Sequence, residues 1–216
     1  MPDFRGGPAD GKRRRLAGAW DALAAPLENR AGFSRMSAPP LLPSPGLWQP
    51  THLADERVAL VPLRPEDFEA LYAVAADPLI WEQHPNPDRY RREIFTTFFA
   101  GALASEGAFL IREQGSGAVL GSSRFYDHRP AESSVLIGYT FFARHCWGRG
   151  YNPAVKRLML GWAFRHVAQV LFHVGASNVR SQIALGRLGG EKTGELEVAY
   201  HGEPPRRNFI YRLTRP

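Results

Sequence analysis

The chain has 216 residues, of which 44% are hydrophobic, and carries a formal net charge of +6 with a sequence pI of about 9.8. This apolar content is enough for one sizeable core. The single cysteine, Cys146, excludes an intramolecular disulfide framework and a cysteine-rich metal site, so we expect a reducing, cytoplasmic setting. No apolar run approaches the roughly 20 residues of a membrane helix, which argues against a membrane protein.

Residues 1–50 are predicted to form a flexible, basic and Pro-rich extension, and residues 51–216 to form the folded domain. The extension contains the basic cluster Lys12-Arg13-Arg14-Arg15 and a Pro-rich stretch at 39–45. Such a segment buries too little apolar surface to order itself. A nucleic-acid arm is one alternative, although half of the net charge lies in residues 1–35 and the body is only mildly basic. Met36 is an alternative natural start.

The domain begins with a predicted strand at 58–61, and Pro65-Glu66-Asp67 then opens a helix that Asp77-Pro78 ends. Asp88 is expected to cap a second helix. Its apolar stripe, spaced for burial on one helical face, consists of Ile94, Phe95, Phe98, Phe99 and Leu103.

Three predicted strands follow at 108–111, 119–126 and 135–142, with a hairpin turn at 115–117. A helix is expected from Asn152, since Asn is a good cap and Pro153 fits the first helical position. The remaining predicted elements are a strand at 170–174, a helix at 178–188, and two final strands near 194–200 and 207–213. This order predicts an α/β fold with a mixed sheet.

The stretch RHCWGRGYNP, residues 144–153, joins a buried strand to an amphipathic helix. Gly148 and Gly150 allow the backbone to curl so that several N–H groups face one point at the positive end of the helix, which is an anion site by geometry. A strand-to-helix turn that needs glycine for steric reasons is the alternative. Neither the Walker pattern nor the dinucleotide fingerprint is present, because Pro153 stands where the third glycine of the fingerprint belongs.

Gly148-Arg149-Gly150 in this setting resembles the acyl-CoA loop of the GNAT N-acetyltransferases. The segment from Asn178 through Ser181 and Leu185 to Gly189 resembles the second cofactor segment of that family. Trp147-Gly148, Tyr151-Asn152, Lys156 and Asn178-x-x-Ser181 are most similar to the ribosomal-protein N-terminal acetyltransferase branch, called Rim-like. The resemblance covers roughly residues 50–214.

The resemblance implies a mostly antiparallel mixed sheet flanked by helices, with a splayed strand pair that holds acyl-CoA. It implies acetyl-CoA as co-substrate and direct attack by a primary amine, either a protein N-terminus or a small amine. The implied cofactor-binding residues are Phe141, Phe142, Ala143, Arg144, Trp147, Gly148, Arg149, Gly150, Tyr151, Asn152, Asn178 and Ser181.

Three positions depart from the family pattern. His145 replaces the usual Gln or Arg of the loop, Leu185 stands where many members have the Tyr acid, and Leu136 where related sequences often have Glu. Ser181 is therefore the candidate that would protonate or stabilise the sulfur, and Glu132 the candidate base that would accept the amine proton. The other candidate bases are Asp127, Glu82 and His84.

No metal is expected, because there is no HExxH motif and no carboxylate at ligand spacing. Cys146 lacks a paired base in the sequence and is interpreted as a bystander. The expected partners are acetyl-CoA and an amine acceptor, without membrane or nucleic acid, and the chain could form a homodimer. A non-catalytic acyl-CoA-binding or sensing protein is the alternative function.

Overall fold

A computed structural model describes residues 46–199 and 205–215, which belong to one compact unit spanning Pro43–Arg215. Most of the predicted extension, including residues 12–15 and 39–45, lies outside the described residues. Residues 46–50 pack on the domain: the ring of Trp48 lies 5.2 Å from that of Phe125, and the side-chain amide of Gln49 donates to the carbonyl of Ala108.

A single eight-stranded sheet has the order β1-β2-β3-β4-β5-β6-β8-β7, and every neighbouring pair is antiparallel except β5 with β6. The strands are β1 Leu53–Ala54, β2 Val58–Pro62, β3 Ala108–Glu113, β4 Val119–Arg129, β5 Ser134–Phe142, β6 Gln169–Gly175, β7 Glu191–Val198 and β8 Arg206–Thr214. The α/β class and the mixed, mostly antiparallel sheet are thus confirmed.

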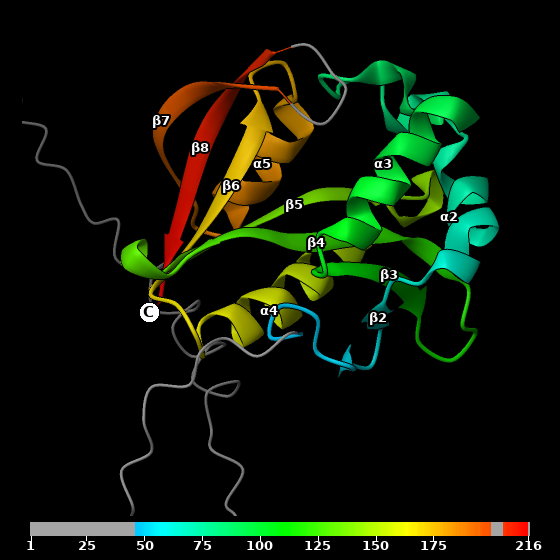
Figure 1. The fold of residues 1–216 in the computed structure, drawn as a ribbon, viewed down its shortest axis with the longest axis horizontal. Helices are drawn as coiled ribbons and strands as arrows, with labels where there is room; N and C mark the ends of the chain where they lie inside the picture. Colours follow the sequence, from blue (N-terminus) through cyan, green and yellow to red (C-terminus); the bar gives the residue numbers. More distant parts are fainter. Residues whose placement is uncertain (1–45, 200–204, 216) are drawn as a thin grey trace, which may run out of the picture. The chain divides into compact units, whose positions relative to one another are not determined.

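In the part of the chain that the structure describes, four α-helices flank the sheet: α2 Phe68–Ala75, α3 Arg92–Ala104, α4 Tyr151–Ala163 and α5 Val179–Arg187. Short 3-10 turns include η1 Pro65–Asp67, η2 Pro78–Ile80, η3 Pro87–Tyr90, η4 Pro130–Glu132 and η5 Arg144–Cys146. Figure 1 shows α3 and α4 on opposite sides of β4 and β5. No helix in these described ranges combines the length and apolarity that a bilayer crossing needs.

The main core lies between the sheet and the α2–α3 pair, where alternate residues of β3 point to one face. Ala108 and Leu110 pack with the helix residues Leu71, Phe95 and Phe98, whereas Phe109 faces the other way and contacts Phe125. The predicted aromatic stripe of α3 is therefore core, with the exception of Ile94, which is 37% exposed.

Two predicted helix starts are wrong. Asp88 does not cap α3, because residues 87–90 form the separate turn η3 and Arg91 precedes the helix. Likewise α4 starts one residue before Asn152, and Gly150, with φ of 85°, is its cap. A glycine in the left-handed region can reverse the chain sharply enough to replace the expected side-chain cap.

Candidate active site

The parallel strands β5 and β6 pair only at their beginnings. The register joins Ser134–Leu136 to Gln169–Leu171, after which β5 continues to Phe142 and β6 to Gly175 without pairing to each other. Figure 1 shows β6 rising away from β5 beyond this point. The splayed pair that the resemblance implied is confirmed, and it leaves backbone polar groups of β5 facing the gap between the strands.

A β-bulge lies on β5 just beyond the separation. Ser122 pairs with Phe141 and Arg124 with Gly138, so Tyr139 and Thr140 together oppose the single residue Ser123. Tyr139 has φ of 53°, a left-handed conformation that costs a bulky residue of the order of 1–3 kcal/mol. The bulge turns the Tyr139 side chain toward α3 and locally re-aims the backbone of β5.

The loop after β5 presents backbone N–H groups at the start of α4. Gly148 and Gly150 have φ of 72° and 85°, and a Cβ at Gly148 would have no atom within 4 Å. Helix α4 has no side-chain cap, and within the described residues the amides of Gly148, Tyr151 and Asn152 have no acceptor. These unsatisfied donors at the positive end of a 13-residue helix form an anion-binding arrangement.

Arg57 reaches this loop from the turn before β2, a contact that no sequence pattern predicts. Its guanidinium donates to the carbonyl of Arg149 at 2.7 Å and lies 5.4 Å from the centre of the Tyr151 ring. The Tyr151 hydroxyl in turn donates to Glu113, so the first residue of α4 is held from the outer side. A surface hollow of about 670 Å³ beside Tyr151 carries mixed charge, with lining residues Asp55, Glu56, Arg57, Glu113, Gln114 and Arg157.

The start of α5 faces the loop across the gap between β5 and β6. The side-chain oxygen of Asn178 accepts from the amide of Ser181 at 3.1 Å, so Asn178 is the cap of α5. Ser181 lies half-buried in the first helical turn. The first proposed cofactor segment thus ends at the start of α4, and the second begins at the start of α5.

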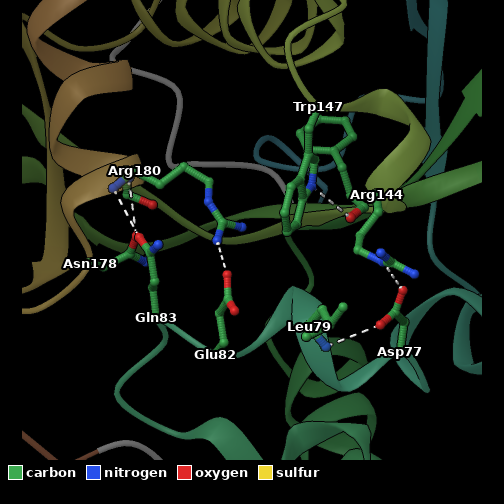
Figure 2. A network of polar contacts seen from close by, with 10 residues as sticks. Asp77, Leu79, Glu82, Gln83, Arg144, Trp147, Asn178 and Arg180 are labelled. Carbon is green, nitrogen blue, oxygen red and sulfur yellow. Dashed lines mark hydrogen bonds and ion pairs between the residues drawn. The ribbon is translucent and has the colours of Figure 1, made fainter.

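The segment between α2 and α3 connects these two helix starts, as Figure 2 shows. Asp77 is ion-paired with Arg144 of the loop, which lowers the pKa of the Asp77 carboxyl, and Glu82 pairs with Arg180 of α5 at 2.9 Å. The guanidinium of Arg180 also lies 3.8 Å from the centre of the Trp147 ring. Loop, segment and α5 therefore form one contact network around the gap.

On the α3 side of the bulge, the wall is aromatic and cationic. The guanidinium of Arg124 lies 3.5 Å from the centre of the Tyr139 ring, whose own centre is 5.0 Å from that of Tyr126. His173, from the separated part of β6, faces Tyr126 with ring centres 6.5 Å apart. Burial lowers the pKa of His173, with a further decrease from Arg129, so the imidazole is neutral at pH 7.

The carboxylate candidates for the base are all paired with arginines. Glu132 is exposed in η4, at the opposite end of β5 from the loop, and its carboxylate lies 3.6 Å from Arg129, which also binds Asp127. Glu82 pairs with Arg180. His84 lies against Arg89, and burial followed by this neighbouring charge lowers its pKa well below the ordinary value. Among the expected residues, the geometry brings the loop and Ser181 together and leaves Glu132 apart from them.

On the α4 side of the bulge, Lys156 is buried against the sheet. Its ammonium donates to Thr140 at 2.7 Å and to Ser123 at 3.4 Å, and burial lowers its pKa to about 7. The sequence indicated Lys156 only as part of a motif, because the helical period marks this position as core-facing but cannot reveal the two hydroxyl acceptors.

Cys146 is buried in η5, where burial raises the pKa of its thiol, so it is protonated at neutral pH. Within residues 46–199 and 205–215, no group of three or more His, Cys, Asp or Glu side chains could hold a metal ion.

Residues 57–191 match the family model described as the acetyltransferase (GNAT) domain. No curated protein matches the chain. A GNAT-family acetyltransferase from Bacillus anthracis is similar in structure with a TM-score of 0.62 and 17% identity, covering 76% of this chain and 98% of that one. A candidate ribosomal-protein-serine acetyltransferase from Vibrio cholerae gives 0.61 and 15%, with coverages of 76% and 97%. RimJ of Mycobacterium smegmatis in complex with CoA-disulfide gives 0.57 and 21%, with coverages of 73% and 81%.

Proposed function

The chain belongs to the GNAT acetyltransferase family, and we propose that it transfers the acetyl group of acetyl-CoA to a primary amine, in the cytoplasm. The observation that carries this proposal is the glycine loop with free amides at the start of α4, directly beside the gap between β5 and β6. An anion seated on the loop would direct a long, thin ligand into the gap and toward the bulge.

The residues present fit a pyrophosphate and an extended arm. Gly148 leaves open space where any side chain would stand, and the first-turn amides of α4 need acceptors. The backbone from Tyr139 to Ala143, which lies beyond the pairing of β5 with β6, would hydrogen-bond the amide groups of the arm, and Asn178 and Ser181 would bound it on the α5 side. A strand N–H near the bulge would polarise the acetyl carbonyl.

The chemistry then needs one proton acceptor and one proton donor. The neutral amine attacks the thioester carbon, the C–N bond forms, and the C–S bond breaks to release the CoA thiolate. We assign the amine proton to the imidazole of His173, directly or through water, because it is neutral and its ring lies 6.5 Å from that of Tyr126, which contacts Tyr139 of the bulge. The Ser181 hydroxyl would donate to the thiolate. Glu132 remains the prediction from sequence for the base.

The cofactor site is tested by Gly148→Asp. A carboxylate about 4 Å from the pyrophosphate would cost about 4 kcal/mol at an effective dielectric of about 20, which is close to a 1000-fold loss of affinity. Calorimetric titration with acetyl-CoA should therefore show strong binding by the natural protein and almost none by the variant.

Gly148→Asn is the matched control, since it has the same size and adopts positive φ as readily but carries no charge. It should keep measurably more acetyl-CoA affinity than Gly148→Asp, and both variants should melt near the natural protein. Equal acetyl-CoA affinity in folded Gly148→Asp and natural protein would contradict the proposal.

A second candidate function is acyl-CoA binding without transfer. It is favoured by Leu136 and Leu185, which replace the polar residues that related sequences carry at these positions. Acetyl-CoA binding without acetylation of any amine in a broad panel would support this alternative over the enzyme.

A further inference from the structure

Arg124 is a buried cation on the α3 side of the bulge. It pairs with Gly138 in the β4–β5 ladder, next to Tyr139, and only 6% of the residue is exposed. One of its amino groups donates to the carbonyl of Gly101 in α3 at 2.7 Å, and its guanidinium lies over the rings of Tyr139 and, at 5.4 Å, Phe98. These contacts hold the guanidinium plane in one orientation.

No carboxylate within the described residues neutralises Arg124. The acidic residues nearest to it in the chain and in the network are bound elsewhere: Asp127 and Glu132 by Arg129, Glu82 by Arg180, and Asp77 by Arg144. Burial lowers the pKa of Arg124 to about 10, so it is still charged at neutral pH. A buried guanidinium with one carbonyl acceptor leaves most of its five donors for another group.

A second cation strengthens the field at this wall. The guanidinium of Arg89 lies 4.7 Å from the Phe98 ring and 5.8 Å from the Tyr139 ring, so both arginines flank the same two aromatic residues. Each lowers the cost of bringing an anion there and raises the cost of bringing another cation.

We propose that the acceptor amine carries its own anionic oxygen group, a carboxylate or a phosphate within a few bonds of the nitrogen, and that Arg124 binds this group. The proposal rests on the proposed acetyl transfer and names the substrate class of that site. The anion would fix the distance between the amine and the bulge, where His173 and the strand amides lie. Polycationic amines, such as polyamines and amino sugars, are excluded by the same charge.

The test compares amines that differ only in the anion. Glycine, β-alanine and γ-aminobutyrate are titrated calorimetrically into the protein saturated with CoA, each against its own amide, and O-phosphoethanolamine is titrated against ethanolamine. CoA replaces acetyl-CoA so that no turnover occurs. We expect at least one anionic member to bind about tenfold or more tightly than its neutral partner, and spermidine not to bind. The carboxylate and phosphate arms show which oxyanion is preferred.

Arg124→Met removes the charge and keeps the length of the stem. It should abolish the preference for the anionic member and leave CoA affinity unchanged, whereas Arg124→Lys should keep part of the preference. Arg112→Met, which removes a partly exposed guanidinium of β3 that pairs with Asp67 of η1, is the matched control and should change neither quantity. If Arg124→Met does not fold, the test is the comparison of the anionic preference between Arg124→Lys and the natural protein.

Two results would overturn the inference: no anionic preference in the natural protein, or the same preference in folded Arg124→Met. Either would leave the proposed function intact as long as CoA binds. Failure of CoA binding itself would instead contradict the proposed function. The two failures can be told apart, because the amine pairs can also be titrated without CoA.

Discussion

His173 is the base that we propose for the acetyl transfer. It stands on the part of β6 that has separated from β5 and faces Tyr126. Its pKa is lowered mainly by burial and by Arg129, so the imidazole loses its acceptor role only at acid pH.

His173→Gln should lower kcat by about 100-fold, within the usual contribution of a general base. In the natural protein, kcat/KM should fall as the pH drops through the pKa of His173, below its usual value of 6.5, and this acidic limb should disappear in the variant. His166→Gln, which removes an exposed histidine whose ring centre lies 4.9 Å from that of Trp162, is the control and should retain both. If the acidic limb of the kcat/KM profile were unchanged in His173→Gln, the general base would be a residue other than His173.

Single residues of the loop could be predicted from sequence, and those of the wall could not. Gly148 and Gly150 lie next to each other in the chain, so the local pattern contains the whole arrangement. Arg124 and His173 come from two separate strands and Arg57 from the turn before β2, so each reaches its neighbours only through the pairing of the sheet. A lone Arg or His in a strand gives no sign of its neighbours, because strand periodicity predicts its face but not what is opposite.

At the scale of the elements, the position of the segment from Asp77 to Asn86 depends on its close contact with the end of β6. At the end of β6, a Cβ on Gly175 would come within 2.4 Å of the Cγ of Pro85. Because the proline ring is rigid and the two segments are held by hydrogen bonds nearby, the steric contact cannot be relieved by a side-chain rotation alone. The segment therefore lies directly against the strand that borders the gap.

Gly175→Ala should cost about 1–3 kcal/mol, the usual cost of overpacking, and lower the Tm by several degrees. Gly186→Ala is the matched control, because a Cβ there meets nothing within 4 Å and alanine favours the helix. It should raise the Tm slightly or leave it unchanged. A Tm of Gly175→Ala equal to that of the natural protein would mean that the segment moves freely away from β6.

Element order and type were predictable because each element carries its own period. The expected sequence of strands and helices is confirmed, while the starts of α3 and α4 were wrong because a 3-10 turn and a positive-φ glycine replaced the expected caps. The separation of β5 from β6 was predicted only through the family resemblance, because no residue pattern in these strands indicates where their pairing ends. The bulge at Tyr139 has no local signal either, because left-handed backbone is rare for tyrosine.

For the whole molecule, Lys156 links global stability to pH. Its pKa is about 7 in the folded protein because of burial, against 10.5 for an ordinary lysine. Between these values the unfolded chain binds the proton and the folded chain releases it, so the free energy of unfolding rises with pH across this window. The rise contributed by this residue is of the order of a few kcal/mol.

Chemical denaturation at pH 7, 8, 9 and 10 should show this rise in the natural protein and lose it in Lys156→Met. Lys192→Met, at an exposed position of β7, should keep it. Comparing variants removes the contributions of Cys146 and Tyr151, whose pKa values are raised and which affect all three proteins equally. A rise of the same size in Lys156→Met would show that Lys156 is hydrated in solution.

The short pairing of β5 with β6 also has a mechanical consequence. Only the first three residues of each strand pair across the junction between the part formed by β1 to β5 and the part formed by β6, β8 and β7, and within each part neighbouring strands pair along most of their length. We therefore expect the sheet to bend most easily at this short junction. Bending there breaks no inter-strand hydrogen bonds within either part. We expect widening along this line to leave the strand pairing of both parts intact and to strain the contacts that span the gap, the Glu82–Arg180 ion pair and the approach of Arg180 to the Trp147 ring.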